Sequence, residues 1–363
     1  MSFFFTDTVF WVNHKYRCQI EDIVCYYDSR AASYSTPTYP SNFSTTNCTH
    51  YIYDGIGVTS LGDVRVLSSY DTSSGFADFQ ALRKNANIKL FVQLGSDRDG
   101  SKSLTNAIAG RCERLVNSVA IFLDQYNFDG VEIDRRTNDF DKGALARFIN
   151  RLRARLYMIN KQLSVSVSAQ LIDAYDITSL SLYADMINFH AYNFTGTFTS
   201  TANLAPLFSA GSATSAVSVN STLTSWLAAG ARRNKINLVV PAFGQTYLLA
   251  SEAQNGVGAR ATGPGTAGSN TKRAGLVARY EFCTLTSYTA ATDAAAATAY
   301  FFSGKNWVSI ETEDTLVQKY TYVLDNGLAG VGIYTLDLDD ATNTCTKGAY
   351  RVAELAYQYF TDA

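Results

Sequence analysis

Eight short runs of apolar, β-branched or aromatic residues recur along the chain, each followed by a longer stretch compatible with a helix. This alternation is typical of βα units around a parallel sheet, and eight units close into a barrel. The sequence therefore predicts an α/β fold of the (β/α)8 TIM-barrel class. Clear helix candidates are residues 104–126 and 142–161. The eight runs are residues 22–27, 49–53, 88–94, 130–134, 163–169, 185–190, 236–243 and 329–335.

The chain of 363 residues exceeds the ~250 residues of a plain barrel, and the excess lies mainly in one place. Residues 244–312, between the seventh and eighth runs, are far more than a βα loop normally holds. We expect a small α+β insertion domain there, with the barrel formed by residues 22–243 and 313–363. A flexible decoration is the alternative. The aromatic residues that favour a small core are Tyr280, Phe282, Phe301, Phe302 and Trp307.

The start of the chain and its cysteines bear on the compartment. Residues 1–21 open with an apolar stretch that Asp7 interrupts, without the basic start or cleavage site of a signal peptide. We interpret this segment as at most a degraded or truncated signal region. Six Cys and four Asn-x-Ser/Thr sequons nevertheless favour an extracellular, secreted glycoprotein. The sequons are at Asn42, Asn47, Asn193 and Asn220.

Charge and composition exclude several kinds of partner. The formal net charge is −2, and no basic stripe is present of the kind that nucleic acid requires. No stretch approaches the ~20 consecutive apolar residues of a membrane-spanning helix. The cysteines and the three His lack metal-ligand spacing, so we expect neither a metal nor another cofactor. We expect a monomer.

The fourth run carries charges where a barrel places its chemistry. Barrel enzymes use residues at the carboxyl ends of their strands. With a two-residue strand period, Glu132, Asp134 and Arg136 share one face, and Val131 and Ile133 share the other. The apolar pair would meet the outer helices, which leaves three charged side chains inside the barrel. Such burial is costly unless the charges are paired or functional.

Residues 129–136, which read Asp-Gly-Val-Glu-Ile-Asp-Arg-Arg, resemble a known catalytic signature. The signature is Asp-Gly-x-Asp-x-Asp-x-Glu of glycoside hydrolase family 18, the chitinases and chitinase-like lectins. The resemblance begins at Asp129, and the family's proton-donating Glu is replaced by Arg136. It continues in order from about residue 23 to 360 and implies the same barrel with its inserted domain. Its other segments are residues 23–28, 48–53, 185–196, 263–285 and 330–340.

The resemblance implies a protein without hydrolase activity. In this family the substrate's own N-acetyl oxygen attacks the anomeric carbon, so the protein must supply a general acid. A guanidinium, with a pKa above ~12, cannot deliver a proton usefully. Loss of the acid alone forfeits a factor of about 100 to 10,000. We interpret Arg136 as a neutralising partner of Glu132 and Asp134.

The same resemblance marks a set of sugar-binding positions, several of which are altered. Asn193 replaces an Asp, Gln245 an Arg and Tyr334 the central Trp, while Glu132 replaces an Asp that positions the acetamide. Arg30, Gly55 and Asp97 stand at positions that are aromatic in active members. A glycan on Asn193 would also obstruct the mouth of the barrel. The expected substrate-binding residues are Tyr27, Asp134, Tyr192, Asn193, Gln245 and Tyr334.

Two disulfides are also implied by the resemblance. The matching positions are Cys25 with Cys48, and Cys283 with Cys345. Cys18 and Cys112 remain, either unpaired or as a third bridge.

Three functions follow from these observations. The first is a secreted, inactive chitinase-like protein that binds chitin or N-acetylglucosamine oligomers. Mite group 18 allergens also lack the catalytic Glu and share the Tyr-Thr-Leu sequence of residues 334–336. The second is a barrel scaffold for protein interaction or signalling. It is favoured by the loss of aromatic residues from the sugar-binding positions and by the charged residues Arg30, Asp97 and Arg98. The third is a weak or altered glycosidase that uses Glu132 or Asp134 as its acid.

Overall fold

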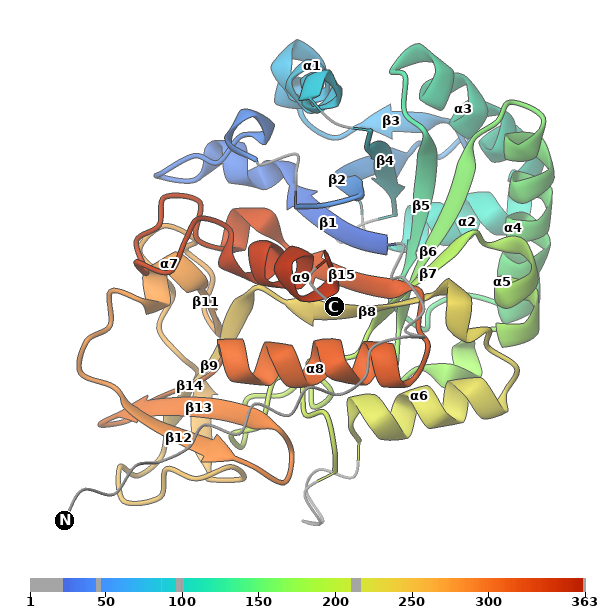
Figure 1. Cartoon of the computed structure of the whole chain (residues 1–363). Coiled ribbons are helices and arrows are strands. Elements are labelled where there is room, and N and C mark those ends of the chain that lie inside the picture. The colour runs from blue at the N-terminus through green and yellow to red at the C-terminus, as the bar shows by residue number, and fades with distance from the viewer. Residues whose placement is uncertain are drawn as a thin grey trace.

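The computed structural model describes residues 22–43, 47–85, 87–95, 99, 101–209 and 217–361. Its centre is a closed ring of parallel strands in which β1 pairs with both β2 and β15 (Figure 1). Each of the eight predicted runs forms one strand of this ring, so the (β/α)8 barrel is confirmed. The short antiparallel β3 (Val64–Val66) extends β2. The ring strands are β1 (Asp22–Asp28), β2 (His50–Val58), β4 (Lys89–Leu94), β5 (Gly130–Arg135), β6 (Gln162–Ser168), β7 (Met186–His190), β8 (Ile236–Pro241) and β15 (Gly330–Tyr334).

Helices surround the ring (Figure 1). The β1–β2 connection holds the 3-10 turns Ser29–Ser33 and Pro40–Asn42. The helix predicted over residues 104–126 is two helices, because the chain leaves helical geometry at Arg111, directly after Gly110, a poor helix former. The helices around the ring are α1 (Phe76–Gln80), α2 (Ser101–Gly110), α3 (Cys112–Gln125), α4 (Lys142–Tyr157), α5 (Ile177–Tyr183), α6 (Val219–Ala228), α8 (Glu313–Asp325) and α9 (Arg351–Thr361). None of the described helices has both the length and the apolar character needed to cross a bilayer.

The two-residue period of the strands divides the core into an outer and an inner part. On β5, Val131 and Ile133 belong to the large cluster between the strands and the helices. Glu132 and Asp134 alternate with them, and Glu132 contacts side chains of β1, β4, β6 and β7 inside the ring. The apolar residues inside the ring form a separate small cluster, which we call the inner cluster: Val24, Tyr26, Ile52, Phe91, Met186 and Val239.

Residues between β8 and α8 form a second, antiparallel sheet beside the barrel (Figure 1). The run predicted over residues 236–243 is divided, because β8 ends at Pro241 and β9 begins at Phe243. A proline cannot donate to the sheet ladder, which favours a strand end there. The elements of this region are β9 (Phe243–Leu249), β10 (Ala261–Pro264), β11 (Leu276–Ala278), α7 (Arg279–Phe282), β12 (Thr289–Asp293), β13 (Thr298–Ser303) and β14 (Asn306–Ser309).

The aromatic residues expected to form one core in this region belong to three small clusters. Trp307 and Phe302 pack on one face of the sheet, with Tyr247. Phe282 and Phe301 pack around Val277, Val308 and Ile310, and Tyr280 contacts a third group. Division of this region from the barrel at residues 244 and 312 stays a prediction.

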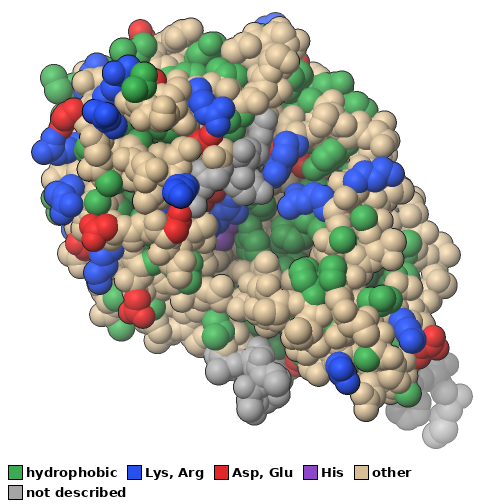
Figure 2. Space-filling view, turned by 180° about the vertical axis from the view of Figure 1, so that it is seen from behind, with side chains coloured by type: hydrophobic (Ala, Val, Ile, Leu, Met, Phe, Trp, Pro, Cys, Tyr) green, Lys and Arg blue, Asp and Glu red, His purple; other side chains and the backbone are tan. Residues whose placement is uncertain are grey.

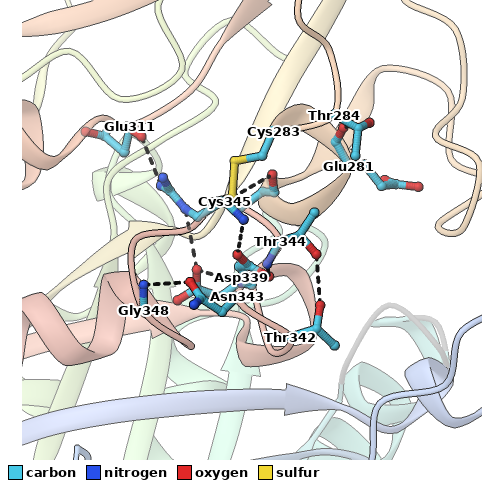
Figure 3. The surroundings of a disulfide bond; sticks show 12 residues. Glu281, Cys283, Thr284, Glu311, Asp339, Thr342, Asn343, Thr344, Cys345 and Gly348 are labelled. Carbon is cyan, nitrogen blue, oxygen red and sulfur yellow. Dashed lines mark hydrogen bonds and ion pairs between the residues drawn. A yellow bond between two sulfur atoms is a disulfide. The ribbon is translucent and has the colours of Figure 1, made fainter.

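Both implied disulfides are present, Cys25–Cys48 and Cys283–Cys345. The second joins the end of α7 to the loop that follows β15 (Figure 3). In that loop Asp340 accepts hydrogen bonds from the backbone N–H groups of Thr344, at 2.9 Å, and Cys345, at 2.7 Å. This bridge therefore ties the inserted region to the last βα unit of the barrel. Cys112 is a free thiol in the described part of the chain, and Cys18 lies outside that part.

Candidate functional site

Arg136, at the family's acid position, is held in an ion pair with Asp134. Its Nε donates to Asp134 Oδ1 over 2.9 Å, and its Nη2 donates to Oδ2 over 2.6 Å. The side chains are 21% and 6% exposed, respectively. Burial alone would lower the pKa of Arg136, but Asp134 outweighs this effect, and the pKa lies well above its ordinary value. Position 136 thus holds a permanent, largely neutralised cation.

Glu132 precedes Asp134 by two residues on β5, points the same way from a deeper position in the barrel, and is fully buried. Its Oε1 accepts hydrogen bonds from Tyr26, at 2.8 Å, Asn188, at 2.6 Å, and Ser164, at 3.1 Å. Its Oε2 accepts one from Gln93 at 2.6 Å. Burial raises the pKa of Glu132, and the hydrogen bonds from Asn188, Gln93 and Tyr26 oppose the rise. The interpretation of Arg136 therefore holds for Asp134, whereas neutral donors surround Glu132.

His190, at the end of β7, connects the hydrogen-bond network around Glu132 to the mouth, the opening of the barrel at the carboxyl ends of its strands. Its Nε2 lies 3.0 Å from Ser166 Oγ, and its Nδ1 lies 2.9 Å from the Tyr192 hydroxyl. Burial, and then the positive charge of Arg136, lower the pKa of His190 well below its ordinary value. The imidazole is consequently neutral at pH 7 and orients the Tyr192 ring.

Tyr334, at the end of β15, lies at the centre of a group of rings at the mouth, which we call the aromatic floor: Tyr26, His190, Tyr192 and Tyr334. Its ring centroid lies 5.2 Å from that of Tyr26, 5.4 Å from His190 and 6.3 Å from Tyr192. The guanidinium carbon of Arg136 lies 4.8 Å from the Tyr334 ring centroid, within cation–π range. Tyr192 and Tyr334 are both partly exposed, so they present ring surface at the mouth.

The structure also brings Asn193 and Gln245 together. Gln245 Nε2, on β9, donates to Asn193 Oδ1 over 3.0 Å. Asn193 is exposed and follows Tyr192 directly, whereas Gln245 is 5% exposed. The inserted sheet thus contributes to the same mouth as the barrel strands. Figure 2 shows a hollow in the face turned away from the viewer of Figure 1, with hydrophobic and histidine side chains in it and basic side chains beside it.

Two of the residues singled out from the sequence lie away from the mouth. Tyr27 is fully buried in the outer core, where its hydroxyl donates to Thr38 O over 2.9 Å. It therefore has no exposed surface with which to contact a sugar. Asp129 precedes β5, at the opposite end of the strand, where it binds Arg83 Nη1 at 2.6 Å. Asp97 and Arg98 lie outside the described residues.

Several inner residues were missed by the sequence reasoning. They point inward from β1, β4, β6 and β7, and together they form the hydrogen-bond network around Glu132. The two-residue period, applied to every run as it was to the fourth, is the signal that finds them. These residues are Tyr26, Gln93, Ser164, Ser166, Asn188 and His190.

The site contains carboxyl groups but no clustered metal ligands. Within the described part of the chain, no three His, Cys, Asp or Glu side chains are grouped as a metal ion would require. Asp134 is committed to Arg136, and Glu132 accepts hydrogen bonds from four side chains. What faces outward is a cation, two tyrosine rings and the amide of Asn193. This arrangement is suited to binding a polar ligand with apolar ring faces.

The fold and this site define a barrel protein with an acidic fourth strand and an inserted sheet. The family model for glycosyl hydrolases family 18 matches residues 22–339. The chain therefore belongs to glycosyl hydrolases family 18.

Individual relatives agree with this assignment. Chitotriosidase-1 of Mus musculus is 29% identical over 357 residues, which cover 90% of this chain and 75% of that protein. The structure of Ostrinia furnacalis Group IV chitinase has a TM-score of 0.89 and 26% identity, and the match covers 94% of this chain and 100% of that one. Human YKL-39, described as a pseudo-chitinase with retained chitooligosaccharide binding properties, has a TM-score of 0.87 at 24% identity, with 94% and 99% covered.

Proposed function

We propose that this chain is a secreted, catalytically inactive chitinase-like protein that binds chitooligosaccharides at the barrel mouth. The observation that carries the proposal is the bidentate ion pair between Arg136 and Asp134, with bonds of 2.9 and 2.6 Å. A guanidinium in such a pair holds its protons more firmly than a free one. No proton reaches the leaving oxygen from position 136.

The remaining carboxyl groups do not replace the missing acid. Glu132 has no exposed surface, and its two oxygens together accept four hydrogen bonds. Asp134 has both oxygens on Arg136. A general acid must come within hydrogen-bond reach of the oxygen that it protonates. The glycosidase hypothesis therefore loses its two candidate acids.

Sugar binding is supported by the exposed rings and by the relatives. The apolar faces of N-acetylglucosamine pack on aromatic rings, and Tyr192 and Tyr334 offer such surface beside Asn193. Human YKL-39 is a pseudo-chitinase that retains chitooligosaccharide binding. Secretion is favoured by the two disulfides, because such bonds persist in oxidising compartments. The proposal includes a relationship to the mite group 18 allergens, because residues 334–336 have the Tyr-Thr-Leu sequence that those proteins share.

The test is calorimetric titration with an N-acetylglucosamine hexamer. The protein should come from the bacterial periplasm, where disulfides form and no eukaryotic N-glycan is attached. We expect saturable heat and a hexamer that mass spectrometry finds uncut. Absence of heat, together with no competition by soluble chitin, would refute binding, and cleaved hexamer would refute inactivity.

The Arg136→Glu variant tests how much hydrolase activity the remaining residues of the site can support once an acid is restored. Since Asn193, Gln245 and Glu132 also depart from the family pattern, we expect this variant to cleave the hexamer at most about 100-fold faster than the uncatalysed reaction. Arg136→Gln, which removes the charge without supplying an acid, is the matched control and should show no cleavage. Activity equal to that of an ordinary chitinase would show that Arg136 is the only lesion.

A scaffold for protein partners is the second candidate. It is favoured by the small number of exposed rings and by Arg30, whose side chain pairs with Asp28 at 2.6 Å and stays 35% exposed at the mouth. Titration separates the two candidates, because a scaffold gives no heat with the hexamer.

A further inference from the structure

We propose that Asn193 carries an N-linked glycan whose first two N-acetylglucosamine units cover the barrel mouth and compete there with free chitooligosaccharides. The inference rests on the proposed function, since it requires a secreted chain and a sugar-binding mouth. It adds a modification site and a means by which the chain limits its own ligand binding.

The acceptor sequence Asn193-Phe194-Thr195 lies on an ordered loop after β7. Asn193 and Thr195 are exposed, while Phe194 packs against the main core. The Asn193 backbone N–H donates to Leu204 O over 2.7 Å. Its φ of 53° is in the left-handed region, which asparagine tolerates better than most residues. The folded chain therefore presents the acceptor side chain to solvent in a fixed position.

The side-chain amide is oriented by one contact. Gln245 Nε2 donates to Asn193 Oδ1 over 3.0 Å, and Gln245 itself is buried. A glycan bonds to Nδ2, so this hydrogen bond to Oδ1 persists in the modified protein. Among the described residues, no hydrogen bond engages Nδ2. Modification at this atom consequently disrupts no contact within the described protein.

The attachment step is the usual one for secreted proteins. Nδ2 loses one hydrogen and forms a bond to the anomeric carbon of an oligosaccharide. The donor is a lipid-linked pyrophosphate oligosaccharide. The bond from the anomeric carbon to the pyrophosphate breaks, and the lipid pyrophosphate leaves together with the proton.

The position places this glycan beside the floor. Tyr192 immediately precedes Asn193, and its ring centroid lies 6.3 Å from that of Tyr334. An N-linked glycan begins with two β1,4-linked N-acetylglucosamine units, which is also the repeating unit of chitin. The attached sugar therefore has the same chemistry as the proposed free ligand.

Tethering makes even weak contacts effective. A ligand on a short link has an effective concentration of about 1 mM or more at its own site. A mouth that binds this disaccharide with a dissociation constant near that value is occupied about half of the time or more. The bulk of the remaining glycan excludes a hexamer in addition. Half occupancy alone weakens the binding of free hexamer about twofold, so we expect a loss of about twofold or more.

Two of the other three sequons differ from Asn193 in setting. Asn220 lies on α6, outside the ring, where its Oδ1 accepts from the Tyr322 hydroxyl over 2.9 Å. Asn42 lies in the 3-10 turn Pro40–Asn42, and its Oδ1 accepts from the Tyr39 backbone N–H at 2.9 Å. Within the described part of the chain, neither of these side chains makes a hydrogen bond to Tyr192, Asn193, Gln245 or Tyr334. They supply comparison sites on the same protein.

The experiment uses the chain secreted from eukaryotic cells. Peptide mapping by mass spectrometry measures occupancy at Asn193, and calorimetry measures hexamer affinity. Thr195→Val removes the sequon with a side chain of nearly the same shape and keeps the Asn193–Gln245 bond. Thr195→Ser keeps the sequon and is the matched control. Asn220→Gln removes a glycan site away from the mouth.

We expect an occupied Asn193, an affinity about twofold or more higher for Thr195→Val, and little change for Asn220→Gln and Thr195→Ser. An unmodified Asn193 overturns the inference, as does equal affinity of the glycosylated protein and the folded Thr195→Val variant. If Thr195→Val melts normally but binds no hexamer in either expression system, the proposed sugar-binding function has failed, and the inference with it. Hexamer binding only by periplasmic protein and by Thr195→Val supports both.

Discussion

Asp337 provides the sharpest test of the electrostatics near the mouth. It follows β15 in the 3-10 turn Leu336–Leu338 and is 1% exposed. The backbone N–H of Asp28 donates to its Oδ1 over 3.0 Å, and the Asp28 carboxylate, itself buried, lies close by with Arg30 as its partner. Burial, and then the charge of Asp28, raise the pKa of Asp337 from its ordinary value of 3.8 to about 7.

The sign of the effect follows from proton binding. The folded chain binds the Asp337 proton more tightly than the unfolded chain, so Asp337 favours folding below about pH 4. This contribution is lost as the pH rises from about 4 to about 7, and above that the ionised carboxylate is at its full cost. A tenfold change in proton affinity equals about 1.4 kcal/mol, so the cost at pH 8 is at most about 4 kcal/mol.

Asp337→Asn removes this charge and keeps an oxygen that accepts from the Asp28 N–H. We expect the variant to exceed the wild type in free energy of unfolding by about 1 to 4 kcal/mol at pH 8. The difference should shrink steadily as the pH falls, and should approach zero only near pH 4. The assay is urea denaturation, followed by circular dichroism, at four or five pH values between 4.5 and 8.

Asp173→Asn, at an exposed position in the 3-10 turn Ile172–Ala174, is the matched control and should change stability by less than about 0.5 kcal/mol. A stability difference for Asp337→Asn that does not vary with pH would refute the reasoning. A variant less stable than the wild type at pH 8 would do so as well, because the carboxylate would then be favourable in the folded state.

Two further changes test the packing around the site. Tyr26→Phe removes the 2.8 Å hydrogen bond to Glu132, and we expect a loss of about 1 to 3 kcal/mol, measured by urea denaturation. An unchanged unfolding midpoint would mean that the remaining donors suffice. Replacement of Cys283 and Cys345 by Ser opens a loop of sequence separation 62, and the chain-entropy model gives a loss of about 4 kcal/mol in the same assay. A loss below about 1 kcal/mol would contradict that model here.

The barrel could be predicted from the sequence because its strands are buried on both faces. Some of these strands, such as β4 and β8, stand out as nearly continuous apolar runs, whereas β5 and β6 alternate apolar with polar residues. Each predicted run became one ring strand. The inserted sheet has strands with exposed positions, such as Thr289 and Ala290 on β12, and gives a weaker pattern. Its aromatic residues were expected in one core, yet the two faces of a sheet cannot share a core, and the strands separate Trp307 from Phe301.

The inward positions of side chains could be predicted where charges mark the inner face, and less readily where both faces are apolar. On β5 the alternation of charged and apolar residues placed Glu132 and Asp134 inside the ring. On β1 the five residues between Asp22 and Asp28 are apolar in both registers, so only these two end residues, which share the register of Tyr26, mark its face as the inner one. The disulfide is the missing clue, because Cys25 lies in the outer core and Tyr27, two residues on, shares its face.

The ion pair at the mouth also bears on the restoration experiment. Glu at position 136 would place a third carboxyl group beside Glu132, which is 0% exposed, and Asp134, which is 5% exposed. Breaking a largely buried ion pair by removing one partner costs about 3 to 5 kcal/mol, and the added like charge increases that cost. We therefore expect Arg136→Glu to be less stable than Arg136→Gln, with the gap narrowing at acidic pH as the carboxyl groups take up protons. If both variants are as stable as the wild type, the ion pair does not contribute measurably to the stability of the fold. Failure of Arg136→Glu to cleave the hexamer would then reflect the other substitutions alone.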